Sequence, residues 1–158
     1  MKKQTNILIL NDIRSTENVG AMFRTADATG IDKIYITGYT ASPVDRFGNK
    51  RSDIAKSALG AEESIPWEYK KSLTPLLTKL AREGYKIICL EQDKRSIHYK
   101  KIKLGEKNIF IVGNEVTGVD KKILDKADVI GEIPMKGKKE SLNVSVSLGV
   151  FLYGVLKI

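Results

Sequence analysis

The chain has 158 residues, which is enough for one domain with a full hydrophobic core and too few for two such domains. A hydrophobic content of 42% excludes an intrinsically disordered chain. The formal net charge of +8 favours a polyanionic partner such as a nucleic acid, with charge kept only for solubility as the alternative. The single cysteine, Cys89, excludes an internal disulfide and a multi-cysteine metal site, and its apolar neighbours predict a buried, inert thiol.

The start of the chain shows no recognisable targeting signal. The apolar run after the first lysines covers only Ile7 to Leu10. Such a run is too short for a signal peptide and far too short to span a membrane. The cytoplasm is therefore the expected compartment.

Strand and helix patterns alternate along the chain, beginning with the continuous apolar run at Ile7. Val19, Met22, Phe23 and Ala26 then recur at helical spacing between possible caps near Ser15 and Gly30. The expected strands span residues 7–10, 33–37, 63–67, 85–90, 109–112 and 129–133. Further expected helices span residues 53–59, 72–82 and 121–126, and residues 38–51 are expected to form a functional loop.

The C-terminal segment fits two patterns. Residues 142–149 alternate with period two, as a strand would. Val144, Leu148 and Phe151 also fit a helix, and sixteen residues are long for a strand. In a helix, the small residues Ser141, Ser145 and Gly149 would form a line where another backbone could approach closely.

The alternation predicts an α/β fold with a mostly parallel sheet flanked by helices. No internal repeat, low-complexity tract or linker interrupts it, so residues 1–158 are expected to form a single domain.

Several common catalytic signatures are missing. The sole histidine, His98, lies in a charged run that favours a solvated or RNA-contacting side chain over a catalytic base. The sequence has no metal-ligand spacing, no G-x-S-x-G elbow and no Walker lysine motif. Gly113–Gly118 is not a G-x-G-x-x-G fingerprint. A nicotinamide or ATP enzyme is therefore poorly supported.

A set of polar side chains lies instead at the expected ends of strands and helices: Asn18, Arg24, Glu115, Ser141 and Asn143. Ligands bind open α/β sheets at such edges, outside the carboxyl ends of the strands. Each residue also has a structural explanation when taken alone. Asn18 and Ser141 could cap helices, Arg24 could be a surface charge, and Glu115 could be an acid near a helix N-terminus.

Three segments together resemble the motifs of the SpoU (TrmH-like) branch of the SPOUT RNA methyltransferases, in a minimal single-domain form. They are N-V-G-A-M-F-R-T-A from Asn18, G-N-E-V-T-G from Gly113, and I-P-M-K-G-K-K-E-S-L-N-V-S from Ile133. The resemblance implies a C-terminal trefoil knot and a homodimer, and it decides for a helix in the C-terminal segment. Val116 departs from the family pattern, which more often places glycine after the glutamate.

The resemblance also implies S-adenosylmethionine as the cofactor and methyl transfer to a ribose 2′-hydroxyl as the reaction, without a metal. The cofactor would be held by Leu90, Gly113, Ile133, Met135, Ser141 and Leu142. Arg24 would act on the hydroxyl and the neighbouring phosphate, working across the dimer, while Asn18, Glu115 and Asn143 would fix Arg24 and the ribose. Ser141 would line the cofactor and substrate pocket.

Basic residues cluster beside this expected site and predict an RNA surface on the domain itself, without a separate RNA-binding domain. The clusters contain Arg46, Lys50, Arg51, Lys136, Lys138 and Lys139, with a third group at residues 94–103 around Tyr99. The family resemblance makes transfer RNA the expected substrate, with ribosomal RNA as the alternative substrate. A non-catalytic RNA-binding protein and a Rossmann-type oxidoreductase are the alternative functions.

Overall fold

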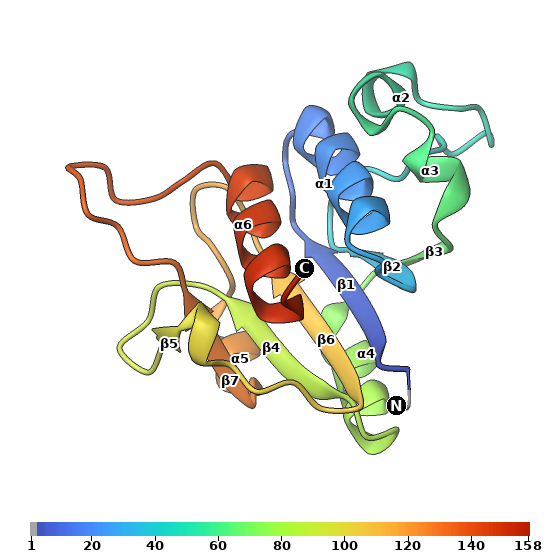
Figure 1. The fold of residues 1–158 in the computed structure, drawn as a ribbon. Coiled ribbons are helices and arrows are strands. Elements are labelled where there is room, and N and C mark those ends of the chain that lie inside the picture. Colours follow the sequence, from blue (N-terminus) through green and yellow to red (C-terminus); the bar gives the residue numbers. More distant parts are fainter. Residues whose placement is uncertain (1–2) are drawn as a thin grey trace.

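Every neighbouring pair of strands in the sheet runs parallel. The computed structural model describes residues 3–158, and seven strands form one sheet in the order β3-β2-β1-β6-β4-β7-β5 (Figure 1). Their bounds are β1 Thr5–Asn11, β2 Lys33–Thr37, β3 Trp67–Lys70, β4 Lys86–Leu90, β5 Ile97–His98, β6 Lys107–Val112 and β7 Val129–Glu132. The chain builds outward from β1 to β3, crosses to β4, and later inserts β6 between β1 and β4. This confirms the expected parallel α/β fold.

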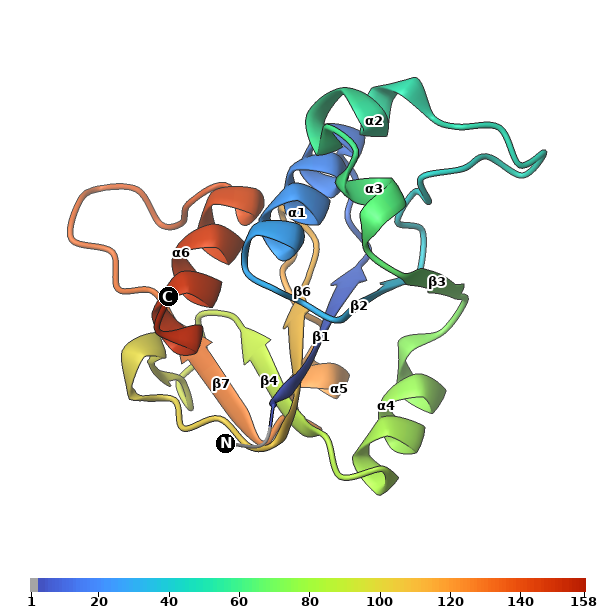
Figure 2. The same ribbon diagram turned by 45° about the vertical axis from the view of Figure 1, so that its right-hand side comes forward.

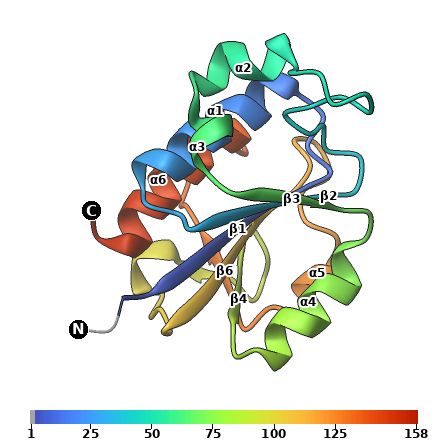
Figure 3. The ribbon, with the colours of Figure 1, turned by 90° about the vertical axis from the view of Figure 1, so that its right-hand side faces the viewer.

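Helices cover both faces of the sheet (Figure 3). The helices α1, α2, α3 and α6 lie on one face, and α4 and α5 lie on the other. Their bounds are α1 Thr16–Ala28, α2 Ser52–Ala58, α3 Ala61–Ser64, α4 Leu73–Arg82, α5 Lys121–Leu124 and α6 Val144–Leu156, with a 3₁₀ turn at Tyr99–Lys101. Figures 1 and 2 both show α6 beside α1, although the two helices stand at opposite ends of the chain.

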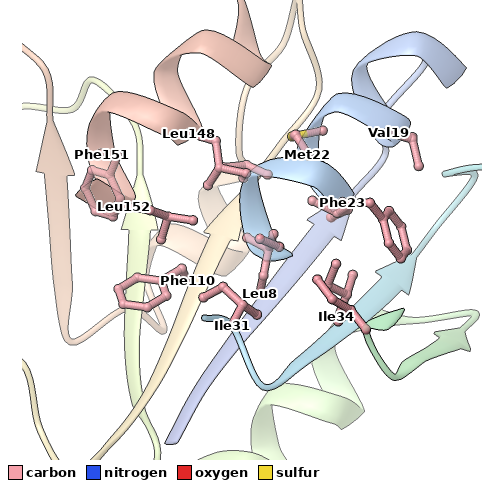
Figure 4. Close-up of a cluster of buried hydrophobic side chains, with 14 of the residues drawn as sticks. Leu8, Val19, Met22, Phe23, Ile31, Ile34, Phe110, Leu148, Phe151 and Leu152 are labelled. Carbon is pink, nitrogen blue, oxygen red and sulfur yellow. The ribbon is translucent and has the colours of Figure 1, made fainter. Parts of the chain in front are cut away.

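The alternation of strand side chains divides the interior into two cores. Leu8 and Leu10 of β1 face the core under α1 and α6, while Ile7 and Ile9 face the core under α4. Because helices cover both faces, the strand is apolar at every one of these positions. Figure 4 shows the first core, where Phe23 of α1 and residues of β1, β6 and α6 meet.

Cys89 is fully buried in the second core, as the sequence predicts. Burial raises the pKa of its thiol to about 12, so the thiol stays protonated and unreactive at neutral pH.

The C-terminal segment is a helix, α6, which starts after Asn143. The Asn143 side chain accepts hydrogen bonds from the amides of Ser145 and Val146, so asparagine is the N-cap. The expected line of small residues does not form along the helix, because Ser141 precedes it. Gly149 faces the chain's own α1, where Thr25 Cγ2 would lie 3.9 Å from an added Cβ.

One expected strand is wrong. Residues 63–67 were expected to form a strand, but α3 ends at Ser64 and β3 begins at Trp67. Pro66 directly precedes this edge strand and contributes only its carbonyl oxygen, which accepts from the Ile34 amide at 2.9 Å.

Residues 94–103 do not form a wholly surface-exposed run. They contain the short strand β5 and the 3₁₀ turn, and Tyr99 is buried against Phe151. Tyr99 is therefore a core residue and no part of an RNA surface. The backbone of Gly154 leaves the space for its ring, since an added Cβ there would lie 2.2 Å from the ring.

Two glycines inside helices should respond oppositely to substitution by alanine. A Cβ at Gly20 would lie 2.4 Å from the carbonyl oxygen of Ile54, so Gly20→Ala forces α1 and α2 apart and should destabilise the protein by about 2 kcal/mol. A Cβ at Gly149 meets only ordinary contact, so Gly149→Ala should stabilise by about 0.5–1 kcal/mol through helix propensity. Urea unfolding at one fixed protein concentration measures both. A Gly20→Ala variant as stable as wild type would contradict the close packing of α1 on α2, and a destabilised Gly149→Ala variant would contradict the open space at Gly149.

Candidate functional site

A cavity opens where three neighbouring strands end. The loops that follow β4, β6 and β7 meet there, and the cavity has a volume of about 260 Å³. Parallel strands place all their carboxyl ends at one edge of the sheet, which explains why these loops converge. The lining residues are Leu90, Glu91, Gln92, Val112, Gly113, Asn114, Glu115, Val116, Thr117, Gly118, Glu132, Ile133, Met135, Glu140, Ser141, Leu142, Val144 and Ser147.

All six residues expected to hold the cofactor lie around this one cavity. They come from all three loops: Leu90 ends β4, Gly113 follows β6, and the other four follow β7. Val116, where the family more often has glycine, has an exposed side chain at the cavity's edge and leaves the neighbouring turn intact. The binding role of these residues stays a prediction, but their convergence is a property of the fold.

Hydrogen bonds join the three loops to one another. The Glu91 carboxylate accepts from the Val119 amide at 2.8 Å and so ties the β4 loop to the β6 loop. The Gln92 side chain donates to the Glu140 carbonyl at 2.7 Å and ties the β4 loop to the β7 loop. Sequence reasoning missed both residues, since their only local signal is that they directly follow a strand.

Asn114 closes the β6 loop into a tight turn. Its side-chain oxygen accepts from the amides of Val116 and Thr117 at 2.8 and 2.9 Å, and its backbone pairs with Gly118 in both directions. An Asx turn of this kind holds the loop in a fixed shape. Asn114 was also missed, although an asparagine directly after a strand is a recognisable turn signal.

Gly113 is required by this turn. A glycine beside a cavity can let a ligand approach the backbone closely. Here, however, an added Cβ would lie 2.4 Å from the Gly118 carbonyl oxygen. Any side chain at position 113 would therefore run into the backbone of Gly118, on the other side of the same turn. A bulky residue at position 113 would disturb the turn itself before it affected any ligand.

Three of the five candidate catalytic residues form one hydrogen-bonded cluster. The Asn18 side-chain amide donates to Glu115 Oε1 at 3.1 Å, and the Asn143 side-chain amide donates to Asn18 Oδ1 at 3.2 Å. Glu115 also accepts from the backbone amides of Arg14 and Ser15 at 2.9 and 3.0 Å. The cluster thus joins the start of α1, the β6 loop and the N-cap of α6, beside the cavity.

The same hydrogen bonds set the charge state of Glu115. Partial burial alone would raise the pKa of its carboxyl group, but the bonds from Arg14, Ser15 and Asn18 outweigh this effect and hold the pKa below its usual value. Glu115 is therefore an anion at neutral pH, placed at the positive end of α1.

Arg24 lies outside this cluster. It is exposed on α1, and its side chain forms no hydrogen bond or ion pair with any residue between 3 and 158. It stands six positions beyond Asn18 on the helix, so the two side chains leave α1 in different directions. The expectation that Asn18, Glu115 and Asn143 fix Arg24 is therefore not met within one chain. Ser141 is exposed at the cavity and belongs to no part of the cluster.

The basic residues differ in whether an acidic side chain already pairs with them. Lys50 pairs with Glu63, and Arg51 forms two hydrogen bonds to Asp53, at 3.2 and 2.8 Å. The guanidinium of Arg46 lies 4.8 Å from the centre of the Phe47 ring and is otherwise open to solvent. Lys136, Lys138 and Lys139 are exposed beside the cavity, and within the described part of the chain they form no ion pair. These three lysines are thus accessible cationic groups near the site.

Glu115→Gln should weaken the fold in a pH-dependent way. At pH 7 the loss of a charged acceptor for three donors should cost about 2 kcal/mol of unfolding free energy. The pKa of Glu115 is lowered in the folded state. Its stabilising effect is therefore fully present above the unfolded pKa of about 4.3 and is lost as pH falls from there through the folded pKa.

Chemical unfolding of wild type and variant between pH 3 and pH 8 measures this difference. Glu17→Gln, at an exposed residue in the first turn of α1, makes the same charge change and should cost about 0.5 kcal/mol or less. A difference in unfolding free energy between wild type and Glu115→Gln that stays constant with pH would contradict the role given to the carboxylate.

Relatives of known sequence resemble nearly the whole chain. The chain is 33% identical over 147 residues to the 23S rRNA (guanosine(2553)-2′-O)-methyltransferase RlmP of Bacillus subtilis, covering 93% of this chain and 56% of that protein. It is 30% identical over 155 residues to a putative TrmH family tRNA/rRNA methyltransferase of Staphylococcus saprophyticus, covering 98% and 59%. The chain therefore spans just under three fifths of the length of these relatives.

Solved structures share the fold. An AdoMet-bound rRNA methyltransferase from Sinorhizobium meliloti superimposes with a TM-score of 0.86 at 22% identity, over 98% of this chain and 57% of that one. The A. aeolicus TrmH/SpoU tRNA modifying enzyme gives a TM-score of 0.84 at 25% identity, over 99% and 76%. The parallel sheet and its shared topology are consistent with the knot that the sequence resemblance implies.

Within residues 3–158, none of the helices has the length and apolar character needed to cross a membrane. The sequence profile described as the SpoU rRNA Methylase family matches residues 5–153, which include all three motifs. The chain belongs to the SpoU rRNA methylase family.

Proposed function

We propose that this chain transfers a methyl group from S-adenosylmethionine to a ribose 2′-hydroxyl of RNA. The observation that carries the proposal is the cavity at the ends of β4, β6 and β7, with the cluster of Asn18, Glu115 and Asn143 at its side. Family membership supports the same reaction. The relatives named above include a 23S rRNA 2′-O-methyltransferase.

The lining of the cavity fits the proposed cofactor chemically. Apolar side chains from Leu90, Ile133 and Met135 suit an adenine ring, while loop backbone offers donors and acceptors to its edge. The carboxylates of Glu132 and Glu140 add negative charge that suits a cation such as a sulfonium or an ammonium.

S-adenosylmethionine supplies a methyl group on a positively charged sulfur, which leaves as a neutral thioether. In the transfer, the ribose oxygen forms the new C–O bond as the C–S bond breaks, and the hydroxyl proton passes to a phosphate oxygen or to water. The work left to the protein is to align the hydroxyl with the methyl group. Arg24 is suited to neutralising the phosphate and orienting the hydroxyl, because a guanidinium keeps its protons and cannot act as a base.

RNA would bind to the surface of this domain, chiefly through Lys136, Lys138 and Lys139 beside the cavity. A 2′-hydroxyl acceptor requires RNA and excludes DNA. Transfer RNA stays the preferred substrate of the proposal and ribosomal RNA its alternative, and the similar proteins include enzymes named for each. Such substrates imply the cytoplasm as the compartment.

We further propose that the active form is a homodimer. Val146, Val150 and Tyr153 form an exposed apolar stripe along α6, with 52%, 39% and 43% of each residue exposed. Their spacing of four and three residues places them on one face. Arg24 lies on the adjacent helix α1 and has no partner within the described chain. Dimerisation through α6 would bury the stripe and would allow Arg24 to act at the cavity of the second copy.

Arg24→Ala should separate chemistry from binding. We expect methyl transfer to fall by at least about a hundredfold, because the residue acts on the reacting hydroxyl, while calorimetric affinity for S-adenosylmethionine stays within about twofold. Single-turnover rates at saturating RNA measure the chemical step. Near-normal single-turnover chemistry would overturn the role of Arg24.

The matched comparison is Lys138→Ala with Lys139→Ala. This double variant should weaken RNA association and lower its salt dependence by about one unit of slope for each phosphate that is no longer bound, with the saturated rate retained. Total RNA and separated transfer and ribosomal RNA, incubated with methyl-labelled cofactor, identify the substrate. Failure to bind S-adenosylhomocysteine or to label any RNA would overturn the proposed function.

Val150→Asp should dissociate the dimer. A carboxylate in the centre of the α6 stripe would be buried without a partner, so we expect sedimentation velocity to show a monomer at micromolar concentration where wild type is dimeric. Thr78→Asp on the exposed side of α4 is the control and should sediment as wild type. A wild-type monomer with full activity would refute the dimer.

A further inference from the structure

One aromatic side chain near the cavity is exposed but held in place. Tyr39 follows β2 and is 61% exposed. Its backbone amide donates to Asp12 Oδ1 at 3.1 Å, and its hydroxyl accepts from the Asn114 side chain at 2.6 Å. Both ends of the residue are therefore fixed, and the part left open to solvent is the ring.

Two residues beside Tyr39 adopt left-handed backbone angles. Asp12 has a φ of 54°, in the left-handed region that a non-glycine residue seldom adopts, and Gly38 has a φ of 66°. Asp12 also occupies the space where a side chain at position 38 would lie, at 1.8 Å from an added Cβ. The Tyr69 hydroxyl donates to the Gly38 carbonyl at 2.9 Å and supports the same turn. These contacts hold the turn, and Tyr39 with it, in one conformation.

Tyr39 is connected directly to the wall of the cavity. The Asn114 side-chain nitrogen that donates to its hydroxyl also donates to the Asp12 carbonyl at 3.1 Å. The side-chain oxygen of the same Asn114 holds the turn that lines the cavity. One asparagine thus sets the position of the exposed ring relative to the cavity.

A second exposed ring lies on the same loop. Phe47 is 73% exposed and carries the Arg46 guanidinium over its face. The tip that bears it is shaped by Asp45, whose carboxylate accepts from the amides of Phe47 and Asn49 at 2.8 and 2.9 Å. By contrast, Lys50 and Arg51 at the base of the loop are occupied by acidic partners. The accessible groups of residues 38–51 therefore include rings and one guanidinium, which are the groups on which bases stack.

We propose that Tyr39 is a base-stacking residue, and that its ring stacks on the face of an unpaired nucleobase in the RNA strand that enters the cavity. A fixed ring loses little entropy on binding, and every base offers a π face, so the contact positions the strand without selecting a sequence. The identity of the strand as substrate rests on the proposed function, while the stacking contact itself does not depend on catalysis.

The test uses single-stranded oligoribonucleotides of mixed sequence with one 2-aminopurine, moved along the strand in a series, and the protein saturated with S-adenosylhomocysteine. Stacking quenches the fluorescence of the base. Wild type should quench one position strongly, Tyr39→Leu should lose this quench and bind at least about fivefold more weakly, and Tyr39→Phe should keep both within about threefold. Tyr85→Leu is the control, because Tyr85 lies just before the start of β4, at the opposite edge of the sheet, and should behave as wild type.

Methyl transfer from labelled cofactor to total RNA is measured on the same proteins, so the two proposals fail separately. Quenching by wild type without any methyl transfer would overturn the proposed function and leave the stacking contact standing. Methyl transfer by wild type with unchanged quenching and affinity in Tyr39→Leu would overturn the stacking contact alone. Absence of quenching by wild type at every position would also overturn it. Circular dichroism of each variant establishes that the loss comes from the ring and not from unfolding.

Discussion

The parallel direction of all strand pairs is the constraint on which the rest of this molecule depends. Parallel strands cannot be joined by tight turns, so each connection crosses a face of the sheet and the helices cover both faces. The same direction places every carboxyl end at one edge. Loops from distant parts of the sequence meet there, and the cavity between β4, β6 and β7 is the result.

Convergence alone would leave three mobile loops, and hydrogen-bonded polar side chains give them fixed positions. Glu91, Gln92 and Asn114 connect the loops to one another. Glu115 and Asn18 connect them to α1, and Asn143 extends the connection to α6. These bonds satisfy donors at loops and helix ends, so stability and the shape of the cavity have the same origin.

The sequence predicts the central strands and long helices well because their signal is local. Ile7 to Leu10 is apolar at every position, as burial between two helical layers requires. The errors fall where the deciding partner is distant. Tyr99 is buried because glycine stands at position 154, and Lys50 is neutralised because Glu63 lies opposite. Neither contact can be predicted from the sequence around Tyr99 or Lys50 alone. The cofactor residues came from motif resemblance. Glu91 carries no comparable local signal, and the turn signal of Asn114 does not reveal that its side chain also reaches Asp12 and Tyr39.

Structural and catalytic explanations of a polar residue look like alternatives in a sequence, but in this fold they coincide. Asn143 is the N-cap of α6, and Glu115 accepts from backbone amides at the start of α1, as the structural explanation requires. The same side chains form the cluster beside the cavity, because the N-termini of α1 and α6 approach the carboxyl edge of the sheet. A capping side chain is fixed by the helix that it caps. It is therefore already oriented for a ligand before one arrives, which is the property that a site built for alignment needs.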